Sequence, residues 1–298
     1  MNNRKQTQLP YYFMLLPAVI ILFVYSYIPM AGIVIAFQKY EPIIGFLKSP
    51  WVGFENFRYV FSMQNFGQVM YNTVYIAVCK IVLQIILCIL FSILINEVRC
   101  TAAKRCIQTL IYFPHFLSWV LLGGILIDLL SPATGLVNKV ITAFGGKAVF
   151  FLADNKWFPT VIIWSEMWKE VGWGTIIYLA AITGIDPTLY EAAKMDGANK
   201  FRQIMSVTIP GMVPIIVLST VLSLGRVLNA GFDQIYNLYS PIVYESGDII
   251  DTLVYRIGLQ EAQYSVGAAI GLFKSAVSLV LVLSSYKLAD KFAGYRVI

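Results

Sequence analysis

The sequence predicts an all-α polytopic membrane protein with about six transmembrane helices. The 298 residues are 58% hydrophobic and only 13% charged, whereas soluble domains average about 25% charged residues. Apolar runs of twenty residues or more recur along the chain, which is the length a helix needs to cross the hydrocarbon core. The alternating ten-residue segments of outer-membrane barrels are missing. We therefore expect one transmembrane domain over residues 1–298 instead of two soluble domains.

The apolar runs place six spans in chain order. The first follows Arg4 and Lys5, and it is too long for a signal-peptide core and lacks a small-residue cleavage site, so we expect a retained helix. An even number of spans puts both ends on one side. Cytosolic ends give the inner connections more Lys and Arg than the outer ones, as in known inner-membrane proteins. The expected spans are about 11–37, 71–95, 107–130, 158–185, 209–230 and 265–287.

The net charge of +6 does not indicate nucleic-acid binding, because no basic run is interleaved with aromatic residues. The four cysteines lack C-x-x-C spacing and His115 is the single histidine. The sequence therefore predicts neither a disulfide framework nor a metal site.

The outer connections are long and aromatic, notably residues 51–57 and 232–255. Two explanations remain open, a folded or docking segment and an aromatic belt at headgroup level. No internal repeat is evident, which weakly disfavours the inverted-repeat secondary carriers.

The connection between the fourth and fifth spans, residues 186–210, carries helix start and stop signals. Asp186 before Pro187 is typical of an N-cap followed by proline at the first helical position. Gly197 can adopt the left-handed conformation that ends a helix, and Asn199 can cap a second helical piece. The sequence therefore predicts a short, stiff helix on the cytosolic face, with four side chains available for a partner's groove: Leu189, Tyr190, Ala193 and Phe201.

One motif in this connection is specific. Glu191-Ala192-Ala193 is followed after three residues by Gly197 and, nine residues further on, by Val207-Thr208-Ile209-Pro210, where Pro210 is expected to reset the chain before the fifth span. The pattern resembles the EAA signature of permease subunits of bacterial ABC importers, with Val and Ile where that family more often has Ile and Leu.

Other segments extend the resemblance over nearly the whole chain. Residues 52–57 and Asn72-Thr73 resemble the sugar-permease branch of the maltose permease type. Residues 229–236 and 251–256 are similar to permeases for polysaccharide fragments. The resemblance implies a type I importer fold in the bacterial cytoplasmic membrane that moves an oligosaccharide or polysaccharide fragment inward.

The resemblance also implies partners: a second homologous permease, a cytosolic ATPase dimer and an extracytoplasmic solute-binding protein. Glu191 would meet a basic group of the ATPase, Ala192 and Ala193 would permit close approach, and Gly197 would make the turn. The chain itself has no Gly-x4-Gly-Lys-Ser/Thr phosphate loop, so it is expected to bind no cofactor, with ATP and magnesium held by the ATPase subunits.

Ionisable residues within the predicted spans are costly in lipid and should face a cavity or a partner. Glu166 and Glu170 are four residues apart, hence on one helical face, and Lys169, three residues after Glu166, could neutralise one of them. At about 1.5 Å per residue, both carboxylates and Arg226 lie about 22 to 28 Å from the cytosolic edge. The resemblance to maltose permease-type subunits, which bind sugar on the helices before and after the connection 186–210, implies a substrate pathway at this depth. Its candidate residues are Trp164, Glu166, Glu170, Trp173, Ser223, Arg226 and Asn229.

These side chains would suit a saccharide, since carboxylates and amides bind hydroxyls and a Trp face covers a pyranose. The alternative is a charged cluster that only fixes helix packing or a subunit contact. Lys80 and Lys274 lie too deep to snorkel easily, so both should face protein or water. Arg226 and Lys274 favour an acidic sugar, whereas Glu166 and Glu170 argue the other way.

Two other functions compete with an ATP-driven importer. An ion-coupled secondary sugar carrier would need a coupling-ion site and no lever for an ATPase. An intramembrane hydrolase could be imagined at His115 and Ser118, but no Gly-x-Ser-x-Gly motif supports it. The EAA pattern favours the importer subunit.

Overall fold

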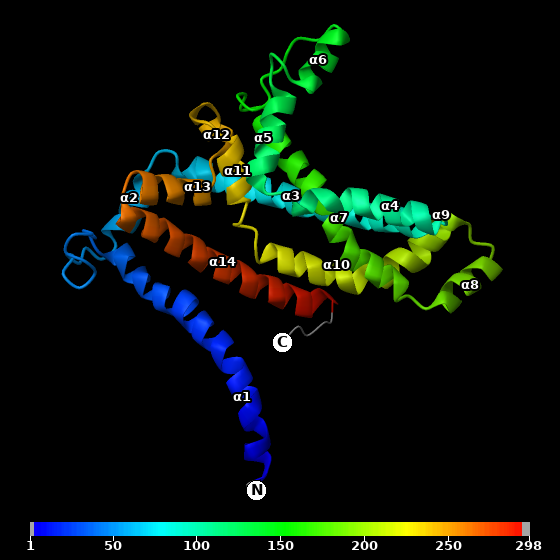
Figure 1. The fold of residues 1–298 in the computed structure, drawn as a ribbon, viewed down its shortest axis with the longest axis horizontal. Coiled ribbons are helices and arrows are strands. Elements are labelled where there is room, and N and C mark those ends of the chain that lie inside the picture. The colour runs from blue at the N-terminus through cyan, green and yellow to red at the C-terminus, as the bar shows by residue number, and fades with distance from the viewer. Residues whose placement is uncertain (1–2, 294–298) are drawn as a thin grey trace. The chain divides into compact units, whose positions relative to one another are not determined.

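The computed structural model describes residues 3–293, and these form helices joined by turns, without a β-strand (Figure 1). Contacts divide them into two compact units. The first extends to Met63 and includes Val254–Phe273, and the second comprises Gln64–Leu253 and the residues from Lys274 onward. The all-helical fold class is as the sequence predicts.

The first unit begins with the longest exposed apolar helix. α1 (Asn3–Leu22) continues through a π-helical turn (Phe23–Tyr27) into a 3-10 helix (Ile28–Phe37). The stretch Pro10–Phe37 is long and apolar enough to cross a membrane, and most of its side chains are exposed. This matches the first predicted span.

The turn after that helix is held by side chains from α2 (Glu55–Ser62). Asn56 Nδ2 donates to the backbone oxygens of Ala36 (2.9 Å) and Gln38 (3.0 Å). The rings of Trp51, Phe54 and Phe57 gather around Phe37, with centroids 5.3 to 5.8 Å apart. The aromatic segment 51–57 is therefore folded, and Trp51 and Phe54 still expose most of their surface.

The second unit is built on the pairing of α3 (Phe66–Glu97) with α7 (Phe158–Thr183). α10 (Ile209–Leu224) packs against both. The apolar core joins α3, α7 and α10 through six buried residues: Cys88, Met167, Val171, Tyr178, Ile182 and Met212. α14 (Tyr264–Ala293) has residues in both units. All four cysteines are free thiols.

The third predicted span, 107–130, is a bent pair of helices. α4 (Thr101–Tyr112) leads into a 3-10 turn (Phe113–Phe116), and α5 (Trp119–Leu130) leaves at 102° to it. Pro114 cannot donate to a regular helix, and Ser118 is extended and caps α5 by accepting from the Leu121 N–H (3.3 Å). Proline and this cap therefore break the helix. The same bond gives Ser118 a structural role.

The connections predicted to lie on the outer side carry short helices. α6 (Leu136–Ala143) follows α5, and α11 (Phe232–Leu238), a 3-10 turn (Pro241–Val243), α12 (Tyr244–Gly247) and α13 (Ile250–Tyr255) follow α10. Asn72 Nδ2 on α3 donates to the backbone oxygens of Glu245 (2.9 Å) and Asp248 (3.2 Å). The segment 232–255 is thus a folded cap on α3, and a π-helical turn (Arg256–Gln260) leads from it to α14.

The count of six spans is not confirmed. Within residues 3–293, four helices are long and apolar enough to cross a membrane: Pro10–Phe37, Phe66–Glu97, Lys200–Leu224 and Tyr264–Lys287. The bent pair would be a fifth. α7 has the length, but Glu166, Lys169 and Glu170 make it more polar. A sixth span therefore stays a prediction.

Candidate functional site

A polar cavity of about 310 Å³ lies between α3, α7 and the end of α10 in the second unit. Lys80 and Gln84 of α3 contribute to its wall, as do Glu166 and Glu170 of α7. The third side comes from residues at and beyond the end of α10: Ser223, Arg226, Asn229, Ala230 and Gly231. The cavity thus brings together five residues of the pathway set inferred from sequence.

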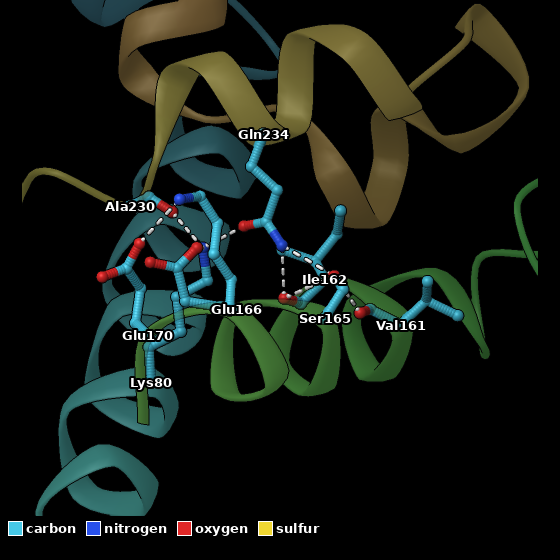
Figure 2. Close-up of polar contacts among 9 residues, drawn as sticks. Lys80, Val161, Ile162, Ser165, Glu166, Glu170, Ala230 and Gln234 are labelled. Atoms are coloured by element: carbon cyan, nitrogen blue, oxygen red, sulfur yellow. Dashed lines mark hydrogen bonds and ion pairs between the residues drawn. The ribbon is translucent and has the colours of Figure 1, made fainter. Parts of the chain in front are cut away.

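Lys80 is the centre of a buried polar network at one wall of this cavity (Figure 2). Its Nζ donates to the carbonyl of Ala230 (2.7 Å) and to Oε1 of Gln234, and lies 3.4 Å from Oε2 of Glu166. Three acceptors match the three N–H bonds of an ammonium group. Lys80 therefore faces protein, as expected from its depth.

Gln234 extends the network from α11 to α7. Its Nε2 donates to the carbonyl of Ile162 (2.7 Å) and to Ser165 Oγ (2.8 Å). Gly231, just before α11, has φ +99°, and a Cβ there would lie 2.9 Å from Lys80 Nζ. Glycine can adopt this positive φ, and because it has no side chain it leaves room for the ammonium group.

Glu170 is held by a second set of contacts. His115 Nδ1 lies 2.8 Å from Glu170 Oε2, and Lys169 Nζ lies 3.1 Å from Glu170 Oε1. The His115 ring stacks on Trp173 with centroids 4.5 Å apart and planes 4° apart. Both carboxylates of the cavity thus have cationic or N–H partners within the chain.

The charged and aromatic residues of α7 have different partners. Lys169 pairs with Glu170, one of the two carboxylates that it was expected to neutralise, and turns toward His115. Glu166 pairs with Lys80 of α3. Trp173 stacks on His115. Trp164 lies with Trp168 at a separate apolar cavity of about 440 Å³. Neither Trp164 nor Trp173 lines the polar cavity.

Arg226 differs from the other charged residues of the cavity. It is exposed, and within residues 3–293 no acidic side chain forms an ion pair with it. Its backbone N–H donates to the Ser223 carbonyl (2.9 Å) in the turn after α10. Lys274, the other cation considered for a substrate, pairs instead with Asp251.

Gln234 and His115 are site residues that sequence reasoning missed. Gln234 lies in an outer connection, and no local pattern marks it as fully buried. His115 was considered only beside Ser118, whose hydroxyl caps α5. One feature of the sequence could have marked His115: it is the single histidine, and it directly follows a helix-breaking proline.

The connection 186–210 folds largely as its signals predict. Asp186 accepts from the Thr188 N–H (2.9 Å) at the start of α8 (Pro187–Met195), and Gly197 follows α8 at φ +75°. Asn199 caps α9 (Lys200–Gln203) by accepting from the Arg202 N–H (2.9 Å). The hydrogen bonds from Thr188 lower the pKa of the Asp186 carboxyl below its ordinary value. These three expectations are confirmed.

Pro210 does not reset the chain. α9 continues through a π-helical turn (Ile204–Thr208) into α10, so Lys200–Leu224 is one helical stretch. Pro210 lies in the first turn of α10, where a missing N–H is tolerated. The fifth span therefore begins and ends earlier than predicted. Glu191 and Ala192 are exposed on α8, as are Leu189 and Phe201, while Tyr190 and Ala193 are half-buried.

Apolar helices surround a polar cavity, and the exposed helix α8 lies between two of them in the chain. These features are those of a multi-pass membrane transport subunit. The family model for the binding-protein-dependent transport system inner membrane component matches residues 84–293, and the chain belongs to this family. It is a permease subunit of an ABC importer, and not an enzyme.

A curated relative and two solved structures are similar over most of the chain. The polygalacturonan/rhamnogalacturonan transport system permease protein YteP of Bacillus subtilis (strain 168) is 43% identical over 94% of this chain and 88% of its own. A chain of a bacterial ABC transporter involved in the import of the acidic polysaccharide alginate matches with TM-score 0.90 and 37% identity, covering 97% of this chain and 98% of its own. The bacterial alginate ABC transporter in complex with alginate pentasaccharide-bound periplasmic protein gives TM-score 0.89 and 36% identity, covering 97% and 96%.

Proposed function

We propose that this chain imports an acidic oligosaccharide or polysaccharide fragment, as one of two homologous permeases that work with a cytosolic ATPase dimer and an external binding protein. The observation that carries the proposal is the charge balance of the cavity. Lys80 neutralises Glu166, Lys169 neutralises Glu170, and Arg226 is left as the cation without an acidic partner in residues 3–293. The alginate importer and YteP support an acidic substrate.

The chemistry of the cavity suits a uronate residue. The Arg226 guanidinium can bind a sugar carboxylate through two parallel N–H bonds. Gln84, Ser223 and Asn229 supply donors and acceptors for hydroxyl groups. The volume of about 310 Å³ is at the lower end for ligand pockets, so the cavity would hold part of a saccharide chain.

The energy would come from the ATPase partner through α8. Glu191 and Ala192 are exposed on this helix, and Leu189 and Phe201 expose about 52% and 72% of their surface. An acidic group beside exposed apolar side chains fits a groove that is apolar and basic. In this arrangement α8 and both termini are cytosolic, the cytoplasmic membrane holds the spans, and ATP with magnesium stays on the ATPase subunits.

Uptake of two matched probes by the reconstituted importer tests the substrate class. The probes are a labelled galacturonate pentasaccharide and the same chain with its carboxyls reduced, both offered with the binding protein. Arg226→Gln should weaken uptake of the acidic probe by roughly 5- to 150-fold, the range expected for one buried polar contact, and Arg226→Lys should lose less. Arg58→Gln, an exposed arginine of α2 outside the cavity, is the matched control. If the wild-type importer takes up both probes equally and Arg226→Gln changes neither uptake, the acidic substrate is excluded.

Reconstitution of the chain by itself tests the partners. Proteoliposomes that contain only this chain should take up neither probe, and addition of the second permease and the ATPase should restore ATP-dependent uptake. Saturable uptake by the chain alone without ATP would instead support the ion-coupled carrier.

A further inference from the structure

The bend between α4 and α5 is joined to the cavity residue Glu170 by the side chains of His115 and Lys169. The break at Pro114 leaves the His115 carbonyl outside a regular helix, and Lys169 Nζ donates to it (2.6 Å). The same ammonium group binds Glu170 Oε1 (3.1 Å), and Glu170 Oε2 binds His115 Nδ1 (2.8 Å). The His115 ring, the Glu170 carboxylate, the Lys169 ammonium group and the His115 carbonyl therefore form a closed circuit of hydrogen bonds across the bend.

The hydrogen-bonding roles in this circuit follow from the groups involved. An ionised carboxylate only accepts, so His115 Nδ1 carries a hydrogen and donates to Glu170. The Lys169 side chain is buried and lies 5.8 Å from the centre of the Trp119 ring, the first residue of α5. The His115 ring is fixed on its face by Trp173. Each member of the circuit is thus held by more than one contact.

The circuit reaches the cavity at one residue. Glu170 lines the cavity, whereas His115 and Lys169 do not. Gln84 Nε2 donates to the Glu170 carbonyl (3.0 Å), which fixes the backbone at this position to α3. With the backbone fixed, the direction of the carboxylate depends on His115 and Lys169.

We infer that His115 is a positioning residue for the cavity, because its Nδ1–H holds the Glu170 carboxylate in one direction and ties the α4–α5 bend to the cavity wall. The inference rests on the proposed function of the cavity. It assigns a role to the single histidine and gives the buried Lys169 a role in α7.

A double-mutant cycle tests whether His115 acts through Glu170. His115→Phe keeps an aromatic ring against Trp173 and removes the donor, whereas His115→Asn keeps an N–H donor near the Nδ1 position. In the full importer, His115→Phe should raise KM for uptake about tenfold, as for a lost bond to a charged group. It should leave subunit co-purification unchanged, and His115→Asn should recover most of the loss.

Glu170→Met, which removes both accepting oxygens, supplies the second half of the cycle, with Glu166→Met as the matched control in the same cavity. Adding His115→Phe to Glu170→Met should change KM by less than twofold, whereas adding it to Glu166→Met should still give about tenfold. A tenfold effect in both backgrounds would overturn the inference. It would also be overturned if His115→Phe failed to assemble and His115→Asn did not recover KM.

The cycle can be separated from the substrate proposal. KM is measured with whichever of the acidic and carboxyl-reduced probes the wild-type importer takes up, so a wrong substrate class changes the probe and leaves the coupling measurable. The melting temperature of the purified complex provides a readout that needs no saccharide. Coupling between His115 and Glu170 in melting temperature but not in KM would limit His115 to packing and overturn the inference.

Discussion

The connection 186–210 and the polar cavity are held by opposite kinds of contact. In the connection, Asp186 is bound by Thr188 and Asn199 by Arg202, so each cap forms within three residues. In the cavity, Lys80 binds the carbonyl of Ala230 and the side chain of Gln234, which lie about 150 residues away in the chain. The difference teaches that the helix caps of the connection form from local contacts, whereas the cavity exists only when α3, α7 and α11 have assembled.

Lys80→Met should have the largest effect and should separate the two regions. The substitution leaves Glu166, Gln234 and the Ala230 carbonyl without their shared donor. Breaking a buried ion pair on one side costs about 3 to 5 kcal/mol, so the yield and melting temperature of the complex should fall. Lys147→Met, at an exposed lysine of an outer connection, is the control. A melting temperature equal to that of the control would mean that the network contributes little to stability.

Glu191→Lys should abolish function without affecting stability. Glu191 is exposed on α8, so reversing its charge should leave the packing of the described helices unchanged. If α8 meets a basic groove, the reversed charge repels the ATPase, and both uptake and ATP hydrolysis stimulated by loaded binding protein should fall more than tenfold. Membrane insertion should stay normal. Asp196→Lys, a charge reversal just after α8, is the comparison, and activities within twofold of wild type in Glu191→Lys would contradict docking by Glu191.

Gly197→Ala should cause a moderate loss confined to the connection. Gly197 has φ +75°, and an added Cβ would have no atom within 4 Å, so only the backbone conformation opposes the change. That conformation costs an L-residue about 1 to 2 kcal/mol. Hydrogen exchange should quicken at the end of α8 and not in α3. Gly184→Ala is the matched control because Gly184 has an ordinary φ of −84°, and equal exchange in both variants would count against the strain.

Asp186→Ala should have the smallest effect, and a pH-dependent one. The hydrogen bonds from Thr188 lower the pKa of Asp186 in the folded chain below its ordinary value. Their stabilising contribution is therefore complete above the ordinary pKa of a free aspartate and is lost as the pH falls through the lower folded value. Hydrogen exchange at the start of α8 should be faster in Asp186→Ala than in wild type at pH 7, and the difference should narrow in strong acid. Asp186→Asn keeps an accepting oxygen and does not titrate, so it should resemble wild type at pH 7 and change less than wild type in strong acid.

The sequence by itself determined the features that depend on neighbouring residues. Composition and apolar runs predicted a helical membrane protein, since the hydrocarbon core requires long apolar helices. Asp186, Gly197 and Asn199 predicted the ends of α8 and α9, because caps and left-handed turns involve residues within one helical turn. The fixed rise of a helix predicted that four residues on either side of the connection 186–210 lie at a similar depth. They are Glu166, Glu170, Ser223 and Arg226.

Only the tertiary structure decided how the charges are paired and where the tryptophans lie. Periodicity allowed Lys169 to neutralise either Glu166 or Glu170. Lys80 from another helix pairs with Glu166, and Lys169 pairs with Glu170 and donates to the carbonyl left free at the Pro114 bend. Trp173 could have faced a sugar, yet it stacks on His115. Helical spacing fixes which residues share a face, whereas the choice among partners depends on which helix packs on that face and on the cost of leaving a buried charge unpaired.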